Sequence, residues 1–304
     1  MQPNRRIMTN MHPGESIDRL GGCGSQSRQR RGIGPMRRLS LDILTVMGME
    51  PLAYIKLASD LACDHVGMQV APVTTIPELY PEWSLRGNPR LLCDIRAALS
   101  DHGLTVHLGE GFLLQPDMDI RDFAMDIEVL AEIGARCVNI CSFDADRNRA
   151  FDALASFAGM ARQAGMSACL EFAPALGIAD LATAVEAVRH AGVPDFGIVI
   201  DAMHFFRSGA TVEDLARLDP ALISYAQICD VPAESSLDYV TEACFERCCP
   251  GEGDLPLEQL VAALPPDIVV GLETPMRGRV LSGEDPVSVL APGVAAARRL
   301  AQVT

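Results

Sequence analysis

Four apolar segments in the second half of the chain end on side chains that carry oxygen. The segments SACLEF, FGIVIDAMH, ISYAQICD and DIVVGLETP lead to Glu171, Asp201, Gln227 and Glu273. A buried carboxylate must be hydrated, paired or bound to metal, because an isolated buried charge is very costly. If the four segments are neighbouring strands, their oxygens form a site for a hard divalent cation. Such a site suits the enolisation of a ketone.

Four other polar residues are candidates for contact with a substrate. His204 and Asp230 each lie three residues beyond one of the strand-end side chains, and Asp230 either positions a substrate or caps its loop. Arg247 precedes Cys-Cys-Pro-Gly-Glu-Gly, in a region where barrels often bind anions, and its forked donors suit that task. His107 ends the third predicted strand, where a structural role competes with a role in the site.

The elements that must position these residues alternate along the chain. Short apolar runs are separated by amphipathic helical patterns, which predicts parallel strands joined by right-handed crossovers. Several helical patterns end at glycine, which supplies a left-handed C-terminal turn. The eight predicted strands cover residues 39–44, 65–70, 104–108, 136–141, 167–172, 196–201, 223–228 and 268–273.

Eight strands alternating with helices favour a closed (β/α)8 TIM barrel over an open doubly wound sheet. Neither GxGxxG after a strand nor GxxxxGK[ST] occurs, so nucleotide-binding folds have no support. Active sites of such barrels lie at the C-terminal ends of the strands. The four oxygen-bearing residues end strands five to eight, so the predicted fold and the predicted site agree.

The charge of the chain is unevenly distributed. The formal net charge is −15, yet residues 1–38 hold eight arginines and two acids and carry +6, which leaves −21 for the rest. An acidic body argues against a nucleic-acid partner. Residues 1–36 have the composition of a disordered extension or precede the true start at Met36, and residues 37–304 form the predicted barrel domain.

The remaining composition limits the location and the chemistry. No run of 18 apolar residues occurs, so no membrane span is predicted. The ten cysteines form no CxxC pair, which suits reduced thiols in a cytoplasmic protein. Lys56 is the only lysine and lies in a helical pattern; this excludes Schiff-base chemistry and a lysine general base. A homo-oligomer is compatible with the sequence.

The order of motifs resembles the xylose-isomerase-like TIM-barrel superfamily. Glu171 is followed by Asp201-x-x-His204, by Arg247 close to Pro-Gly-Glu-Gly and by Leu-Glu273-Thr, and the resemblance covers roughly residues 37–302. The superfamily includes sugar-phosphate isomerases and epimerases, ketose 3-epimerases, inosose dehydratases and isomerases, and endonuclease IV. The motif order is fairly specific to the superfamily, but it is not specific to one substrate.

In the epimerases that the chain resembles, two Glu, one Asp and one His bind Mn²⁺, Mg²⁺ or Co²⁺. The resemblance implies that Glu171 and Glu273 are metal ligands and acid/base catalysts and that Asp201 is a ligand. His204 and Arg247 would contact a small polyhydroxy ketone, with His204 counted among the catalytic residues. The implied function is a metal-dependent isomerase or epimerase that works through an enediolate.

The chain departs from this pattern on strand seven, where Gln227 replaces the usual His. An all-oxygen site is harder than one with imidazole, so Mg²⁺ or Mn²⁺ is expected over Zn²⁺, with Co²⁺ a third candidate. Dehydratases of 3-dehydroshikimate also have an amide here, which makes a dehydratase of the 3-dehydroshikimate or inosose type the alternative. A non-catalytic metabolite-binding barrel is a second alternative. Endonuclease IV is excluded, because its three-zinc site needs several histidines.

Overall fold

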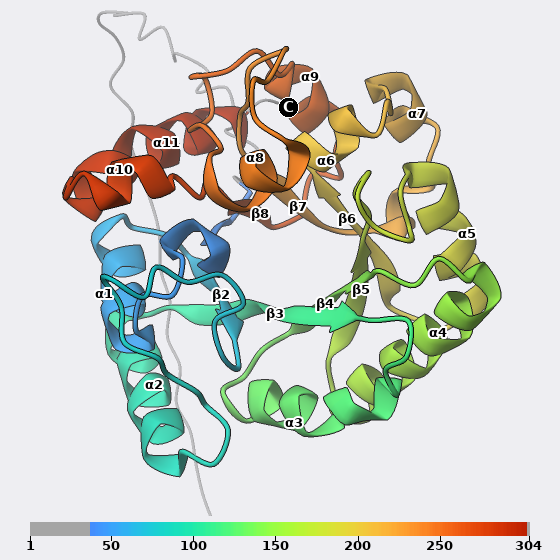
Figure 1. Ribbon diagram of the computed structural model, residues 1–304, viewed down its shortest axis with the longest axis horizontal. Helices are drawn as coiled ribbons and strands as arrows, with labels where there is room; N and C mark the ends of the chain where they lie inside the picture. The colour runs from blue at the N-terminus through green and yellow to red at the C-terminus, as the bar shows by residue number, and fades with distance from the viewer. Residues whose placement is uncertain (1–36, 303–304) are drawn as a thin grey trace, which may run out of the picture. The chain divides into compact units, whose positions relative to one another are not determined.

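The strands form one closed barrel in the computed structural model, which describes residues 37–302. All eight pair in parallel, each with its neighbours in sequence, and β1 pairs with β8 (Figure 1). This confirms the predicted (β/α)8 TIM barrel, whereas the predicted extension at 1–36 lies outside the described residues. The strands are β1 Leu39–Leu41, β2 His65–Gln69, β3 Thr105–Leu114, β4 Cys137–Ser142, β5 Ser167–Glu171, β6 Phe196–Asp201, β7 Ile223–Ile228 and β8 Val270–Leu272.

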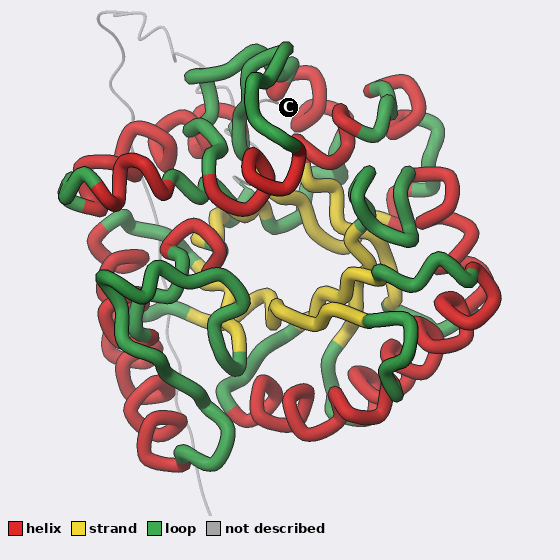
Figure 2. Tube along the Cα trace, viewed as in Figure 1, coloured by secondary structure: helices red, strands yellow, loops and turns green. Residues whose placement is uncertain are grey.

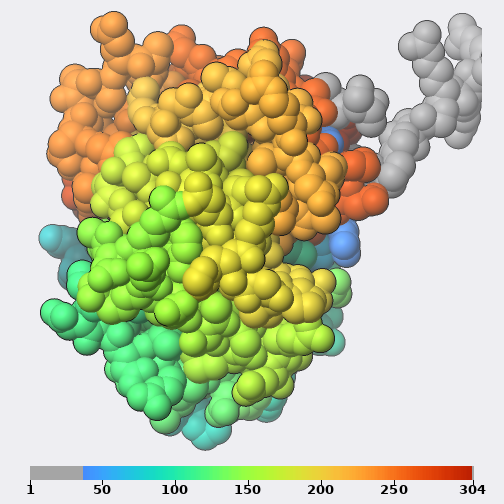
Figure 3. Space-filling view, turned by 90° about the vertical axis from the view of Figure 1, so that its right-hand side faces the viewer, coloured from blue at the N-terminus to red at the C-terminus, as the bar shows by residue number. Residues whose placement is uncertain are grey.

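Helices surround the strands, as the helix and strand colours of Figure 2 show, and α4, α5 and α7 lie on the face seen in Figure 3. None of the helices in residues 37–302 is long and apolar enough to cross a membrane. The helices are α1 Pro51–Asp60, α2 Pro89–His102, α3 Ala124–Glu132, α4 Arg147–Gln163, α5 Leu181–Ala191, α6 Ala202–Arg207, α7 Val212–Ala216, α8 Tyr239–Phe245, α9 Leu257–Ala263, α10 Arg277–Leu281 and α11 Pro286–Leu300, with short 3-10 turns η1 Ile43–Val46, η2 Ile120–Phe123 and η3 Pro220–Leu222.

Local sequence signals fix where several helices start and stop. The side chain of Asn88 accepts a hydrogen bond from the backbone of Leu91 at the start of α2, and Gly103 ends this helix in the left-handed conformation. The Asp180 side chain caps α5 in the same way, and Gly192 ends it. These caps provide hydrogen-bond partners for backbone groups that a helix terminus leaves unpaired. They therefore define where each helix ends and the chain turns toward the next strand.

Alternation along the strands separates the barrel interior from the layer under the helices. Cys169, Val199 and Tyr225 are fully buried and belong to one small apolar cluster. Each lies two residues before a strand-end side chain and therefore on the same face of its strand. This apolar layer lies beneath the strand-end residues. The larger apolar cluster collects residues from both strands and helices.

Strand β3 is longer than the sequence predicted. It was expected at 104–108 but runs from Thr105 to Leu114. Its pairing with β4 shifts register between Gly109 and Phe112, and Gly111 between them has a φ of +94°, a value that favours glycine. The strand end is therefore moved six residues along the chain, and other side chains reach the mouth of the barrel.

Candidate active site

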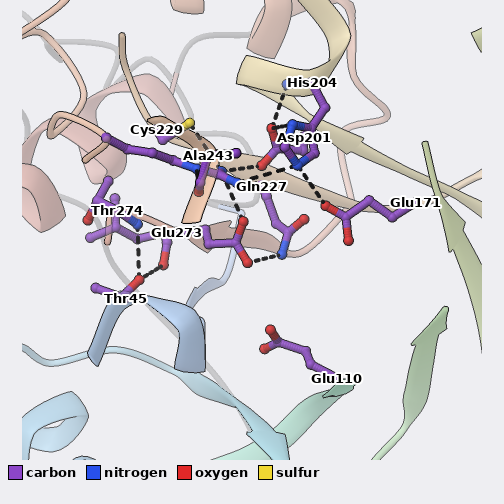
Figure 4. A network of polar contacts seen from close by, with 12 residues as sticks. Thr45, Glu110, Glu171, Asp201, His204, Gln227, Cys229, Ala243, Glu273 and Thr274 are labelled. Carbon is purple, nitrogen blue, oxygen red and sulfur yellow. Dashed lines mark hydrogen bonds and ion pairs between the residues drawn. The ribbon is translucent and has the colours of Figure 1, made fainter. Parts of the chain in front are cut away.

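The four predicted strand-end residues come together inside the barrel mouth (Figure 4). Asp201 and Gln227 are register partners on β6 and β7. Gln227 is paired in turn with Gly271, two residues before Glu273. All four residues are buried, with exposed fractions of 7% for Glu171, 1% for Asp201, 0% for Gln227 and 4% for Glu273. The parallel barrel thus brings together residues that are far apart in sequence.

Arg247 is the buried counter-charge of this group. Its Nη1 lies 2.6 Å from Asp201 Oδ2 and 2.9 Å from Glu273 Oε2. Its Nε donates to the carbonyl oxygen of Ala243 at 2.7 Å, and its Nη2 lies 3.4 Å from His204 Nε2. All three guanidinium nitrogens therefore contact the protein. The predicted contact between Arg247 and a substrate has to compete with these interactions.

Glu171 lies at the side of the cluster that faces β4. Asn139 Nδ2 donates to Glu171 Oε2 at 2.6 Å, and the Cys141 thiol lies 3.5 Å from the same oxygen. Burial, reinforced by the negative charge of Asp201, raises the pKa of Glu171 to about 7. A carboxyl with such a pKa can both take and return a proton near neutral pH.

His204 lies in the first turn of α6, three residues after Asp201. Its backbone N–H donates to Asp201 Oδ1 at 2.8 Å, so Asp201 caps the helix that carries His204. Its Nδ1 lies 2.6 Å from the hydroxyl of Tyr239, and its Nε2 lies 3.4 Å from Glu171 Oε1. Burial lowers the pKa of His204 to about 4. The imidazole is therefore neutral at pH 7, held between Tyr239 and Glu171.

Gln227 and Glu273 form a hydrogen-bonded pair with unsatisfied oxygens. Gln227 Nε2 donates to Glu273 Oε1 at 2.9 Å. Gln227 Oε1 and Glu273 Oε2 are buried and accept no hydrogen bond, although the latter has the ion pair with Arg247. Burial raises the pKa of Glu273 well above its usual range, in opposition to Arg247. Burial also acts to raise the pKa of Asp201. There, however, the charges of Arg247 and His204 outweigh burial, and the pKa lies below its usual range.

The donor set fits a divalent cation. Ligand atoms of Glu171, Asp201 and His204 all lie within 4.8 Å of one another, and Gln227 Oε1 and Glu273 Oε2 add two buried oxygens without hydrogen bonds. A carboxylate has about four acceptor positions, so Asp201 can hold a cation and Arg247 together. These residues could therefore hold a metal ion.

Two predicted substrate contacts lie elsewhere. His107 is in the interior of β3, where its ring stacks on Tyr225 with centroids 5.4 Å apart, and it does not line the cavity at the strand ends. Asp230 accepts hydrogen bonds from the backbone N–H groups of Val231, Gly251 and Leu255 at 2.9–3.0 Å. Asp230 therefore caps its loop, which is the structural one of the two interpretations. The prediction that His107 ends a strand was wrong, because β3 continues to Leu114.

The cavity also has polar residues that were not predicted from the sequence. Glu110 and Gln69 come from β3 and β2, Asn139 from β4 and Tyr239 from α8, and all line the cavity. Glu110 points toward the strand-end cluster from the opposite wall in Figure 4. Burial, then the charge of Asp42, raises its pKa well above the usual range. Residues two apart on a strand share a face. Glu110 therefore lies on the same face as Leu108 in a strand that continues beyond residue 108, which the sequence did not predict.

The cavity at the strand ends has a volume of about 230 Å³. Its floor is polar and includes Glu171, Glu273, His204 and Arg247. Its upper wall is apolar, with residues from the segments after β2, β4 and β5 and from α8. The predicted site residues that line it are thus joined by hydrophobic side chains that the motif order did not indicate.

Comparison with solved structures gives the same fold. The protein IolI with a bound zinc atom is 18% identical, with a TM-score of 0.68, and covers 86% of this chain and 96% of its own. A D-psicose 3-epimerase solved with D-fructose is 13% identical, with a TM-score of 0.66, over 87% of this chain and 99% of its own. A Bacillus anthracis protein described as a probable 3-DHS dehydratase, AsbF, is 14% identical, with a TM-score of 0.65, over 86% and 98%.

Sequence comparisons add the family. No curated protein matches the chain. The family model described as the xylose isomerase-like TIM barrel matches residues 55–300, which include every strand from β2 to β8 and all of the strand-end cluster. The chain therefore belongs to the family of xylose isomerase-like TIM barrels.

Proposed function

We propose that the chain is a divalent-metal-dependent isomerase or epimerase of a ketose, cyclitol or related polyhydroxy ketone, acting through an enediolate. The observation that carries this proposal is the convergence of three buried carboxyl groups with Gln227 at the ends of consecutive strands. The family and its structural relatives, which include epimerases, support an enzyme of this kind.

Glu171, Asp201, Gln227 and Glu273 would hold the cation. Oxygen ligands favour Mn²⁺ or Mg²⁺, with Co²⁺ a third candidate. When bound, the cation would polarise the ketone and stabilise the negative charge that develops on its oxygen.

Glu171 and Glu273 would move the proton. One carboxylate removes the proton next to the carbonyl, and the other returns a proton to the opposite face or to the neighbouring carbon. Asn139 orients Glu171 through its 2.6 Å hydrogen bond, and Gln227 orients Glu273 at 2.9 Å. Neutral His204 would help to position Glu171, because its Nε2 lies 3.4 Å from Glu171 Oε1 while its Nδ1 is held 2.6 Å from the Tyr239 hydroxyl.

A dehydratase is the second candidate. Glu110 is a buried carboxyl on the opposite wall of the cavity, and burial raises its pKa well above its usual range. A protonated carboxyl there can donate its proton to a departing β-hydroxyl group after the same α-proton has been removed. The amide of Gln227 on β7 supports this candidate as well.

The experiment is proton exchange in D₂O with Mn²⁺ on a panel of ketoses, inososes and 3-dehydroshikimate. Deuterium uptake without a new absorbance supports an isomerase or epimerase, and the new absorbance of a conjugated or aromatic dehydration product supports a dehydratase. Glu171→Gln and Glu273→Gln should each lower exchange by a factor of about 10² or more. The exposed Glu258 provides the control substitution Glu258→Gln, which should leave exchange unchanged. Full exchange in both site variants would refute the assignment.

A further inference from the structure

The positive charge in the cavity is already balanced. Among residues 37–302, Arg247 is the single arginine or lysine that lines the cavity, and its residue is 3% exposed. It is paired with Asp201 and Glu273 at 2.6 and 2.9 Å. His204, the other basic side chain of the lining, is already engaged, because its Nδ1 lies 2.6 Å from the Tyr239 hydroxyl and its Nε2 lies 3.4 Å from Glu171 Oε1. An anionic group of a substrate would therefore find no free cationic partner.

A bound divalent cation would leave no excess of positive charge in the cavity. The cation and Arg247 together carry as much positive charge as ionised Glu171, Asp201 and Glu273 carry negative charge. Glu110 adds a further carboxyl at the wall. Burial of a phosphate or a carboxylate without a paired cation is strongly unfavourable. The floor thus favours uncharged hydroxyl and carbonyl groups.

The rim of the cavity has the opposite character. Val73, Phe143 and Val240 line it although their exposed fractions are 49%, 40% and 54%. They are three of the nine large hydrophobic side chains that are exposed within residues 37–302. They come from three separate segments, after β2, after β4 and in α8. Exposed apolar side chains that gather around a concave site indicate contact with an apolar part of a ligand.

We propose that the cavity takes an uncharged α-hydroxy ketone that carries a hydrocarbon or aromatic group, and that it discriminates against sugar phosphates and carboxylates. The hydroxy ketone end lies on the polar floor, and the apolar group packs between Val73, Phe143 and Val240. This inference rests on the proposed function, since it assigns the reacting end of the substrate to the strand-end cluster. The inference also distinguishes an isomerase or epimerase from a 3-dehydroshikimate dehydratase, because 3-dehydroshikimate carries a carboxylate.

The test compares three matched probes by calorimetric titration with Mn²⁺ present. Hydroxyacetone supplies the reacting end alone, 2-hydroxyacetophenone adds a phenyl ring, and 4-(hydroxyacetyl)benzoate adds a negative charge to that ring. We expect the phenyl ring to tighten binding by about tenfold or more and the carboxylate to reverse this gain. Equal or tighter binding of the carboxylate, no gain from the phenyl ring, or no binding of 2-hydroxyacetophenone would each overturn the proposal.

Two variants locate the effect. Phe143→Ala should weaken binding of 2-hydroxyacetophenone at least about fivefold and leave hydroxyacetone unchanged. Met125→Ala is the matched control, because Met125 is 66% exposed on α3 and does not line the cavity. Val73→Lys should restore binding of the carboxylate probe by supplying a cation at the rim. If Phe143→Ala behaves like Met125→Ala, the apolar surface serves contact with another protein and the proposal is wrong.

A second measurement distinguishes failure of this inference from failure of the proposed function. Exchange of the α-protons of the same probes in D₂O is recorded in parallel with binding. Binding with the expected preferences but without exchange refutes the enzyme and keeps the ligand class. Exchange with the opposite preferences refutes the ligand class and keeps the enzyme.

Discussion

Arg247 Nη1 lies 2.6 Å from Asp201 Oδ2, and both side chains are at most 1% exposed. The same nitrogen lies 2.9 Å from Glu273 Oε2. One guanidinium therefore compensates two of the three carboxylates that would hold a cation. Binding of a cation would be coupled to this ion pair, because both would act on the same oxygens.

Replacement of Arg247 by Met should destabilise the metal-free protein by about 3–5 kcal/mol, because it leaves buried carboxylates without a counter-charge. Mn²⁺ should restore part of the loss, since the cation supplies the missing positive charge. Urea unfolding with and without Mn²⁺ measures both effects. Arg279→Met is the control, at a half-exposed surface position, and should change stability by less than about 0.5 kcal/mol. A variant R247M as stable as the parent would show that the ion pair is not a structural element.

Addition of Mn²⁺ or Mg²⁺ should raise the melting temperature. A cation that binds only the folded state adds about 2.7 kcal/mol at a hundredfold excess over its dissociation constant. Glu171→Gln should remove most of this stabilisation, because an amide is a weaker ligand than a carboxylate. Differential scanning calorimetry across a metal titration provides the measurement. Glu258→Gln should respond to metal like the parent, and an equal response of E171Q would remove Glu171 from the ligands.

Replacement of Gln227 by His should change the metal preference. An imidazole nitrogen favours Zn²⁺ and Co²⁺ over Mg²⁺ relative to an amide oxygen, so the affinity ratio of Zn²⁺ to Mg²⁺ should rise about tenfold. Competition titrations with a fluorescent chelator give this ratio. The same substitution at exposed Gln259 on α9 adds a histidine away from the site and should leave the ratio unchanged. If Q227H and Q259H behave alike, Gln227 does not contact the cation.

Part of the loss of folding stability at acidic pH should come from His107. Burial lowers its pKa to about 3, below the value of about 6.5 expected in the unfolded chain. Between these values the unfolded state binds the extra proton, so stability rises with pH there and is lost as pH falls. His107→Gln should flatten the slope of unfolding free energy by at most about 1.4 kcal/mol per pH unit, measured by urea unfolding between pH 4 and 6.5. The substitution should not affect exchange of substrate protons, because His107 does not line the cavity.

Protonation of His65 should lower folding stability at acidic pH in the same way as protonation of His107. His65 therefore serves as an internal comparison. Burial lowers its pKa to about 4, and its Nδ1 lies 2.6 Å from Thr105 Oγ1. The His107→Gln variant should therefore keep part of the slope. A slope identical to that of the parent would show that His107 titrates normally in the folded state.

Much of the site could be predicted because it depends on local patterns. Glu171 and Asp201 end strands that can be recognised by their apolar runs, Gln227 lies one residue before the end of β7, and Glu273 follows directly on β8. In a closed parallel barrel the ends of consecutive strands must be neighbours. The positions of these four residues therefore follow from strand order alone.

Other residues could not be placed in this way. The role of Glu110 depends on where β3 ends, which is set by a register shift against β4 and leaves no clear signal in the apolar pattern. Asp230 has the spacing of a site residue, but the path of its loop brings the N–H groups of Gly251 and Leu255 to its carboxylate. Spacing alone does not show the direction of a loop.

The barrel, the order of the strand-end side chains and the net acidic charge of the chain follow from the amino-acid sequence. These features depend on residue type and on periods of two and 3.6, which are local properties of the chain. The pairing of Arg247 with Asp201, 46 residues away, and the shared rim of Phe143 and Val73 depend on the folded structure. Such contacts form between elements that are distant in sequence, and the packing of the whole barrel fixes their geometry.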